Sequence, residues 1–149
     1  MNPLFPGKLS NIAPPLLLFT LLLVSDRATK LWALASFSET LGGGPILSLG
    51  LRFNRGISFS FFTGYPSVGA AMAITAITLL ALFCAKAKAT RRTPGVIFLW
   101  AGAICNLLDR LLYGYVVDWF RVLLYMNLAD LWLIAGALLV LRSLGAESR

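Results

Sequence analysis

The stretch DRLLYGYVVDWFRVLLYMNLAD, residues 109–130, sets three aspartates among leucine, valine and aromatic side chains. The whole chain of 149 residues contains only six acidic residues, and half of them lie in this stretch. A carboxylate beside lipid is costly and usually faces a protein interior. Asp109, Asp118 and Asp130 therefore need either a partner or a function.

The composition indicates an integral membrane protein. Hydrophobic residues make up 58% of the chain and charged residues only 13%. A soluble domain would be closer to half apolar and richer in charge. The length leaves room for about four spans of roughly 20 residues each. We therefore expect a single integral membrane domain over residues 1–149.

The charge and the reactive side chains exclude several classes of function. The net charge is +7, but the positive residues cluster beside apolar runs, so membrane topology explains them better than nucleic acid does. The chain has no histidine, and its two cysteines, Cys84 and Cys105, both lie in apolar runs. These features predict no nucleic-acid partner, no metal site and no cofactor.

Apolar runs predict four spans, and a glycine- and serine-rich segment separates the first two. The segment over residues 40–63 shows partial alternation, which is typical of strands and turns, and we expect it to rest on the membrane surface. The first run resembles the start of a signal peptide, but no small-residue cleavage site ends it, so we read it as an uncleaved span. The four spans are expected over residues 12–37, 68–85, 96–115 and 128–144.

The positive charges orient these spans. The segment KAKATRRTPG, residues 86–95, carries four positive residues, which places it in the cytoplasm. With four spans, both termini then lie on the cytoplasmic side. The glycine-rich segment and the loop around Asp118 lie on the outer side.

This topology predicts that two of the acids meet near the outer surface. Asp118 follows the outer end of the third span, and Asp130 lies in the first turn of the fourth. Neighbouring helices pack about 8–10 Å apart, so the two carboxyls can approach each other. Two adjacent carboxylates share a proton and can hold a water between them, which is the chemistry of aspartic proteases.

Plainer interpretations of the same residues stay open. Asn127 is a possible N-cap, with Asp130 a first-turn acid that favours the helix dipole. Asp118 could be a hydrated interfacial residue. In FNRGISF, Asn54 and Gly56 could bind a peptide main chain, or could simply form a tight turn.

Further polar residues occur inside the predicted spans. Asn106, Asp109 and Arg110 share one face of the third span, which must look into the bundle. They form either a polar wall that holds a substrate backbone or an internal ion pair. Asp26 and Lys30 stand four residues apart, so they can neutralise each other and join the same pocket.

Four motifs in this order resemble the lipoprotein signal peptidases, the type II signal peptidases of bacteria. The resemblance covers nearly the whole chain and is specific as a set. The motifs are DRATK (residues 26–30), FNRGISF (53–59), AGAICNLLDRLLYGYVVDW (101–119) and MNLAD (126–130).

The resemblance implies an all-α membrane protein with four transmembrane helices, a small extracytoplasmic β-cradle and an interfacial helical segment. We expect a monomer in the bacterial cytoplasmic (inner) membrane, with cytoplasmic termini and an active site near the outer face. The implied activity is that of an aspartyl endopeptidase. It would cut diacylglyceryl-modified prolipoproteins just before the lipidated cysteine, without a cofactor, and its partners would be this substrate and membrane lipid.

The resemblance also assigns roles to residues. Asp118 and Asp130 match the catalytic pair. The expected substrate contacts are Asn54, Gly56, Asn106, Arg110 and Asn127. The expected structural polar network is Asp26, Lys30 and Asp109.

The chain departs from the family pattern in two places. Ala101 and Cys105 stand where the family usually has glycine, which should tighten helix packing or narrow the pocket. The segment between Asp118 and Asp130 is also shorter than usual. Two other functions remain as alternatives: a non-catalytic relative that binds lipidated precursors, and a small four-helix transporter.

Overall fold

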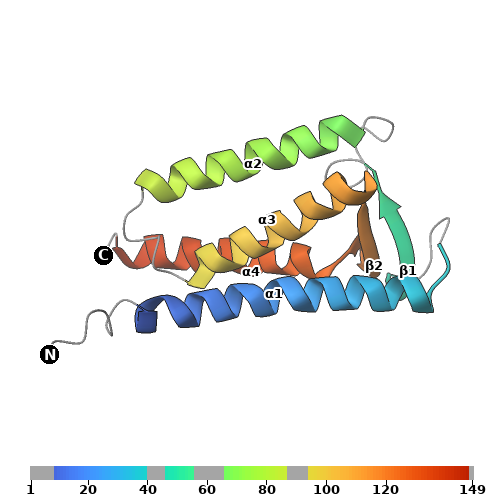
Figure 1. The fold of residues 1–149 in the computed structure, drawn as a ribbon, viewed down its shortest axis with the longest axis horizontal. Helices are drawn as coiled ribbons and strands as arrows, with labels where there is room; N and C mark the ends of the chain where they lie inside the picture. The colour runs from blue at the N-terminus through green and yellow to red at the C-terminus, as the bar shows by residue number, and fades with distance from the viewer. Residues whose placement is uncertain (1–8, 40–45, 56–65, 87–93, 148–149) are drawn as a thin grey trace, which may run out of the picture.

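The computed structural model describes residues 9–39, 46–55, 66–86 and 94–147. In Figure 1 the described helices run side by side along one axis, and a small sheet lies at one end of them. The elements in chain order are α1 (Leu9–Ser36), β1 (Leu47–Asn54), α2 (Pro66–Lys86), α3 (Pro94–Tyr113), β2 (Val116–Val122), β3 (Leu124–Met126) and α4 (Leu128–Glu147).

The helix α3 holds the bundle together, because it packs against α1, α2 and α4 (Figure 1). It begins at Pro94, whose fixed φ suits the first position of a helix. It ends before Gly114, which adopts a left-handed φ of 77° and donates its N–H to the Arg110 carbonyl oxygen at 3.0 Å. This glycine cap turns the chain from α3 into the sheet.

Glycines let α3 approach α4 almost to backbone contact. A Cβ on Gly102 would lie 2.5 Å from the Ala129 carbonyl oxygen and 2.8 Å from Leu133 Cγ. A Cβ on Gly95 would lie 2.9 Å from the Gly136 carbonyl oxygen. The closest approach therefore falls beside the first turn of α4, which carries Asp130.

The sheet is antiparallel, with strand order β1-β2-β3. In its register Arg52 lies opposite Asp118, and Asn54 lies opposite Val116. Strands β2 and β3 form a hairpin that turns at Leu123, which adopts a left-handed φ of 67°. Such a conformation is unusual for a bulky residue, so the hairpin is a tightly constrained connection.

An apolar core fixes the sheet to the C-terminal half of α1. Its buried members are Ala33 on α1, Leu51 on β1 and Val117 on β2. Side chains alternate between the two faces of a strand. Since Val117 points into this core, its neighbour Asp118 points to the opposite face. Partly buried side chains that complete the core are Phe37, Phe53, Tyr115 and Trp119.

Three of the described helices are long and apolar enough to cross a membrane, over Ile12–Ser36, Pro94–Tyr113 and Leu128–Ala146. They overlap three of the predicted spans. The remaining predicted span, the second in chain order at residues 68–85, lies within α2. The apolar stretch of α2 among the described residues is the shorter Ala73–Phe83. The chain is therefore a multi-pass membrane protein.

The segment after α3 differs from the prediction. We expected a loop around Asp118, but VVDWFRV forms strand β2 and pairs with β1. Its valines and aromatic residues favour a strand, and the partner strand lies more than 60 residues earlier in the chain. The predicted β segment contains β1, and its residues 40–45 and 56–63 lie outside the described part. An interfacial helix does not occur within the described ranges.

Gly102→Ala is expected to lower the stability of the folded protein, because the new Cβ would meet the Ala129 carbonyl oxygen at 2.5 Å. Overpacking of this kind costs about 1–3 kcal/mol. Thermal unfolding in detergent micelles measures the effect.

The matched control is Gly145→Ala on α4, where a Cβ would meet nothing within 4 Å. It should leave the melting temperature unchanged or raise it, since alanine favours a helix over glycine by about 1 kcal/mol. Equal melting temperatures for the two variants would contradict close packing at Gly102.

Candidate active site

Two charged residues on α1 begin a buried polar cluster. The ammonium nitrogen of Lys30 lies 2.8 Å from Asp26 Oδ2, and these side chains are 1% and 0% exposed. The same nitrogen lies 2.8 Å from Oδ2 of Asp109 on α3. The pair anticipated from the spacing in DRATK therefore forms, and it extends to a second helix.

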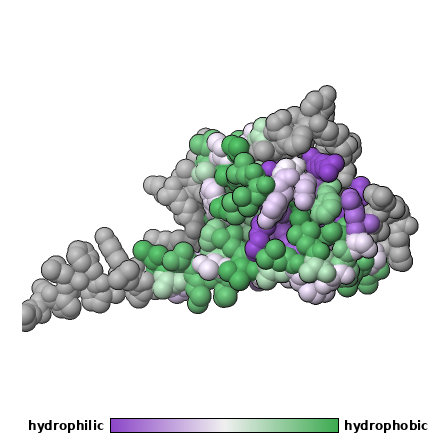
Figure 2. All heavy atoms as spheres, turned by 45° about the vertical axis from the view of Figure 1, so that its right-hand side comes forward, coloured by the Kyte–Doolittle hydropathy of each residue, from purple (hydrophilic) through white to green (hydrophobic). Residues whose placement is uncertain are grey.

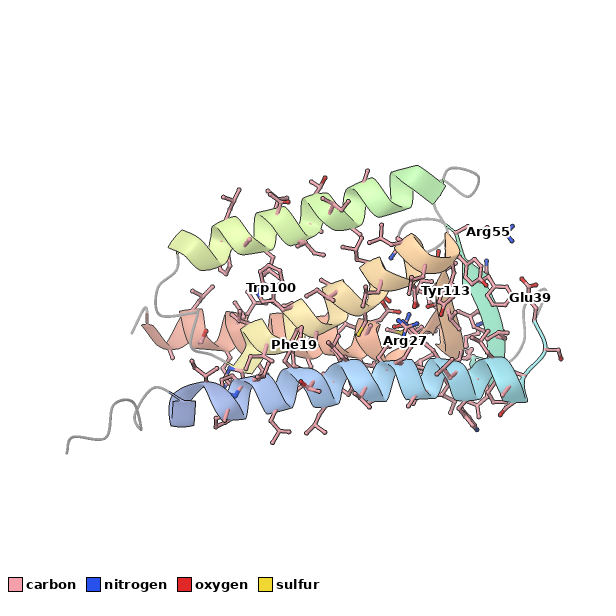
Figure 3. The ribbon with its side chains drawn as sticks, in the orientation of Figure 1. Phe19, Arg27, Glu39, Arg55, Trp100 and Tyr113 are labelled. Carbon is pink, nitrogen blue, oxygen red and sulfur yellow. The ribbon has the colours of Figure 1, made fainter. Side chains whose placement is uncertain are left out.

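A second cation, Arg27, completes the cluster. Its Nη1 lies 2.7 Å from Asp109 Oδ1, and Figure 3 shows Arg27 where α1 faces α3. Two cations now balance two carboxylates, which removes the penalty that an unpaired buried charge would carry. The sequence analysis missed Arg27, because only the fold brings Asp109 to it.

The cluster also binds backbone groups of the elements that carry the predicted catalytic acids. Asp26 Oδ1 accepts a hydrogen bond from the Ala129 N–H at 3.0 Å. Asp109 Oδ2 accepts one from the Val117 N–H at 3.4 Å. The cluster thus holds the start of α4 and strand β2 in place.

Asn127 caps α4 together with Asp130. The side-chain oxygen of Asn127 accepts a hydrogen bond from the Asp130 N–H at 3.1 Å, and Asp130 Oδ2 accepts one from the Asn127 N–H at 3.1 Å. This reciprocal arrangement is a capping box. The prediction of an N-cap followed by a first-turn acid is confirmed.

The same asparagine reaches the second acid. Its Nδ2 donates to Asp118 Oδ1 at 2.6 Å, and Asn54 Nδ2 donates to Asp118 Oδ2 at 3.2 Å. Asp118 is 2% exposed. The buried residue Asn127 is therefore hydrogen-bonded to the Asp118 carboxyl through its side chain and to the Asp130 carboxyl through its backbone N–H.

Helix α3 supplies the remaining contact to Asp130. Asn106 Nδ2 donates to Asp130 Oδ1 at 2.9 Å, so both oxygens of this carboxyl accept hydrogen bonds. Arg110, one turn further along α3 and half-buried, donates from Nη1 to the Asn106 carbonyl oxygen at 3.1 Å. The face of α3 predicted from the sequence thus looks toward the acids.

The surroundings of Asp118 change its acidity. Burial and the neighbouring charge of Asp130 raise the pKa of the Asp118 carboxyl to about 7, while hydrogen bonds from Asn127 and Asn54 act in the opposite direction. Desolvation and a like charge both disfavour the ionised form. At neutral pH this carboxyl can therefore both give and accept a proton.

The structure brings most of the predicted site residues together. Asn54, Asn106 and Asn127 each hydrogen-bond a carboxyl of the pair, and Arg110 adjoins Asn106. Gly56 lies outside the described residues. Within the described ranges, no three histidine, cysteine, aspartate or glutamate side chains gather as metal ligands would.

Exposed apolar side chains lie beside the acids. On β2, Asp118 shares its face with Phe120 and Val122, because side chains alternate along a strand. Figure 2, which brings the sheet end forward, shows hydrophilic residues set among hydrophobic ones. Such a surface suits an apolar ligand that presents a polar group to the acids. The exposed apolar residues around this face are Leu47, Leu49, Val122 and Leu124.

Comparison with known sequences gives a consistent picture. The model of the family described as signal peptidase (SPase) II matches residues 18–145. The lipoprotein signal peptidase of Nitrobacter hamburgensis is 33% identical over 159 residues, covering 95% of this chain and 92% of that protein. That of Sinorhizobium fredii is 35% identical over 143 residues, covering 83% and 81%.

The fold also matches solved structures. A bacterial membrane enzyme determined at 2.3 Å resolution superposes with a TM-score of 0.72 at 22% identity, covering 92% of this chain and 90% of the other. A second, determined at 1.9 Å, gives a TM-score of 0.70 at 23% identity. At these identities the likeness concerns the fold alone.

Asp118→Asn is expected to stabilise the protein more at pH 8 than at pH 4. The folded Asp118 carboxyl has a pKa of about 7, above the value of about 3.9 for an unfolded chain. As the pH rises through this window, the unfolded chain releases its proton first, so the wild type loses stability, by a few kcal/mol in total. Asparagine does not titrate and avoids this loss.

Melting temperatures of both proteins from pH 4 to pH 8 measure this difference. Glu39→Gln, which removes an exposed carboxyl, is the control. A gap between Asp118→Asn and wild type that stays constant with pH would contradict the raised pKa.

Proposed function

The chain belongs to the signal peptidase II family, and on that premise we propose that Asp118 and Asp130 form the catalytic pair of an aspartyl endopeptidase. Its substrates are diacylglyceryl-modified prolipoproteins, and it cuts their signal peptides just before the lipidated cysteine. The observation that carries this proposal is that Asn127 donates to both carboxyls, from its side-chain Nδ2 to Asp118 Oδ1 at 2.6 Å and from its backbone N–H to Asp130 Oδ2 at 3.1 Å.

The two acids take different roles. Asp118 is the more buried, and its pKa of about 7 keeps a proton available near neutrality. Asp130 accepts hydrogen bonds on both oxygens and lies at the positive end of α4, which favours a carboxylate. Asp118 is therefore the acid of the first step, and Asp130 is the base.

The reaction proceeds in two proton-balanced steps. Asp130 takes a proton from a water molecule, whose oxygen attacks the scissile carbonyl carbon, while Asp118 gives its proton to the carbonyl oxygen. The product is a neutral tetrahedral diol. Asp130 then protonates the leaving nitrogen, the C–N bond breaks, and Asp118 recovers a proton from a diol hydroxyl.

The residues around the pair receive the substrate. Arg110 is half-buried next to Asn106 and can donate to substrate carbonyls near the cut, as Asn54 can from the sheet. The exposed apolar face of the sheet accompanies the lipid-bearing part of the substrate. Asn106 and Asn127 contribute mainly by holding the acids. A contact of Gly56 with the peptide main chain stays a prediction, because Gly56 lies outside the described residues.

The same fold supports a proposal for the membrane arrangement. We infer that α2 is a fourth span and that the protein crosses the bacterial cytoplasmic membrane four times. The sheet lies at the end of the bundle opposite the start of α1 and the end of α4 (Figure 1). The basic residues that follow α2 mark the cytoplasmic end. The active site then lies near the outer face, and the enzyme works as a monomer.

Replacement of either acid tests the catalytic pair. Asp118→Asn and Asp130→Asn should each lower cleavage of a diacylglyceryl prolipoprotein peptide by at least about 10²–10⁴-fold. Mass spectrometry locates the cut before the lipidated cysteine. Glu39→Gln, which removes a carboxyl outside the site, should retain activity, and turnover near the wild-type rate in either asparagine variant would exclude the pair.

The pH dependence of cleavage tests the role of Asp118. Activity should fall as the pH rises through about 7 and Asp118 loses its proton. Asn54→Ala removes a hydrogen bond that favours the ionised form, so the pKa of Asp118 rises further and the alkaline limb moves to higher pH. Rates measured between pH 5 and pH 10, with Thr75→Ala on α2 as the control, show the direction. A limb that moves to lower pH would contradict this role.

A further inference from the structure

The buried lysine on α1 contacts more than its two carboxylate partners. The ammonium nitrogen of Lys30 also donates to Asn106 Oδ1, 3.5 Å away on α3. Asn106 Nδ2 in turn donates to Asp130 Oδ1 at 2.9 Å. A single amide group therefore links Lys30 to the acid on α4.

The chemistry of lysine decides which way this amide points. An ammonium group has three donors and no acceptor, whereas an amide has an acceptor oxygen and a donor nitrogen. With Lys30 on one side, the oxygen of Asn106 must face the lysine, and its NH₂ group must face Asp130. An apolar side chain at position 30 would leave both orientations open.

The ion partner of the lysine fixes the backbone beside the same acid. Asp26 Oδ1 accepts a hydrogen bond at 3.0 Å from the N–H of Ala129, the residue before Asp130. The pair of Asp26 and Lys30 is buried, so water does not compete for these bonds. Helix α1 thus constrains Asp130 through its backbone and through its side chain.

We propose that Lys30 is a positioning residue for the cleavage reaction and acts on Asp130 through the amide of Asn106. This inference rests on the proposed function, because it concerns the acid assigned there as the base. Lys30 orients the Asn106 NH₂ group toward Asp130. This NH₂ group holds one carboxylate oxygen of Asp130 in place and leaves the carboxyl oriented toward the attacking water. Small displacements of such groups can cost about 10²-fold in rate.

The competing interpretation is that Lys30 only neutralises buried carboxylates. In that case any substitution that keeps the cluster neutral would have the same effect on activity. The cluster contains two cations and two carboxylates, so one ion pair can be removed while the other remains. The chain therefore offers two matched variants.

The test variant is Asp26→Asn combined with Lys30→Met. It keeps an oxygen that can accept from the Ala129 N–H, and it leaves the pair of Arg27 and Asp109, 2.7 Å apart, intact. Methionine is an unbranched side chain that fills the space of the lysine stem. The change removes the ammonium group from Asn106 without creating an unpaired charge.

The control variant is Arg27→Gln combined with Asp109→Asn. It removes the other ion pair and leaves Lys30 and Asp26, 2.8 Å apart, in place. The oxygen of an asparagine at position 109 can take the place of Asp109 Oδ2, which accepts from both Lys30 and the Val117 N–H, so the contact with β2 is also kept. Lys30 therefore stays in contact with Asn106 in the control.

The measurement is steady-state cleavage of a diacylglyceryl prolipoprotein peptide, with melting temperatures for every protein. In the test variant, kcat should fall about 10–100-fold while KM changes by less than about threefold, because only the positioning of the acid is affected. In the control variant, both constants should stay within about twofold of wild type. Melting temperatures should fall to a similar extent in both.

A cycle with Asn106→Ala tests the route. If Lys30 acts through Asn106, adding the test substitutions to Asn106→Ala should lower kcat by less than about threefold further, because independent effects would multiply. Multiplied losses would overturn the route. If the test variant fails to fold, Asn106→Asp replaces it. This change keeps an oxygen that can accept from Lys30, but it places a carboxylate oxygen, instead of the NH₂ donor, next to Asp130. Because Asp130 loses the donor that positions it, kcat should fall about 10–100-fold.

The outcomes separate the two proposals. The role of Lys30 alone is overturned if the wild type cleaves the peptide and the test variant has an unchanged kcat. A wild-type kcat in Asn106→Asp has the same meaning. An equal loss of kcat in the test and control variants assigns the effect to general destabilisation and also overturns it. Absence of cleavage by the folded wild type overturns the proposed function and this inference with it.

Discussion

The fold depends on the neutral ion cluster between α1 and α3. Lys30 lies 2.8 Å from both Asp26 and Asp109, and Arg27 lies 2.7 Å from Asp109. Inside a membrane bundle a lone buried charge is strongly unfavourable, so Asp26, Lys30 and Asp109 can be buried only together with their ion partners, including the partly exposed Arg27. Each carboxylate also binds a backbone N–H, from Ala129 on α4 or from β2. Charge neutralisation between two helices thereby fixes the elements that carry the acids.

Structural and chemical roles meet in one side chain. Asn127 begins α4 through a capping box with Asp130 and donates to Asp118 at 2.6 Å. The plain interpretation, an N-cap, and the functional one, a catalytic pair, therefore both rest on Asn127. The cap uses the amide oxygen and the backbone N–H of Asn127, so the amide NH₂ group remains to donate to Asp118.

Local patterns in the sequence predicted the helices and the facing residues of α3, because apolar runs and spacings of three or four residues carry that information. They predicted that Asp118 and Asp130 meet, because the connection is short. They could not predict β2, whose partner β1 is distant, nor the contact of Arg27 with Asp109. We expected tighter helix packing at Ala101 and Cys105, which stand where the family usually has glycine, but such packing also depends on contacts between helices. Ala101 and Cys105 are buried, but the glycines of α3 whose added Cβ would meet the α4 backbone are Gly95 and Gly102.

The short connection between Asp118 and Asp130 makes the sheet part of the geometry of this pair of acids. Strand β2 turns directly into β3 at Leu123, whose N–H donates to the Ile46 carbonyl oxygen at 3.2 Å. A longer loop would leave the position of Asp118 to local flexibility, whereas a hairpin fixes it by strand register. Since side chains alternate, a slip of one residue would turn Asp118 into the apolar core and Val117 toward Asp130. The burial of Val117 against Ala33 opposes that slip. Hydrophobic packing on one face of the sheet therefore fixes the orientation of the Asp118 carboxyl on the opposite face.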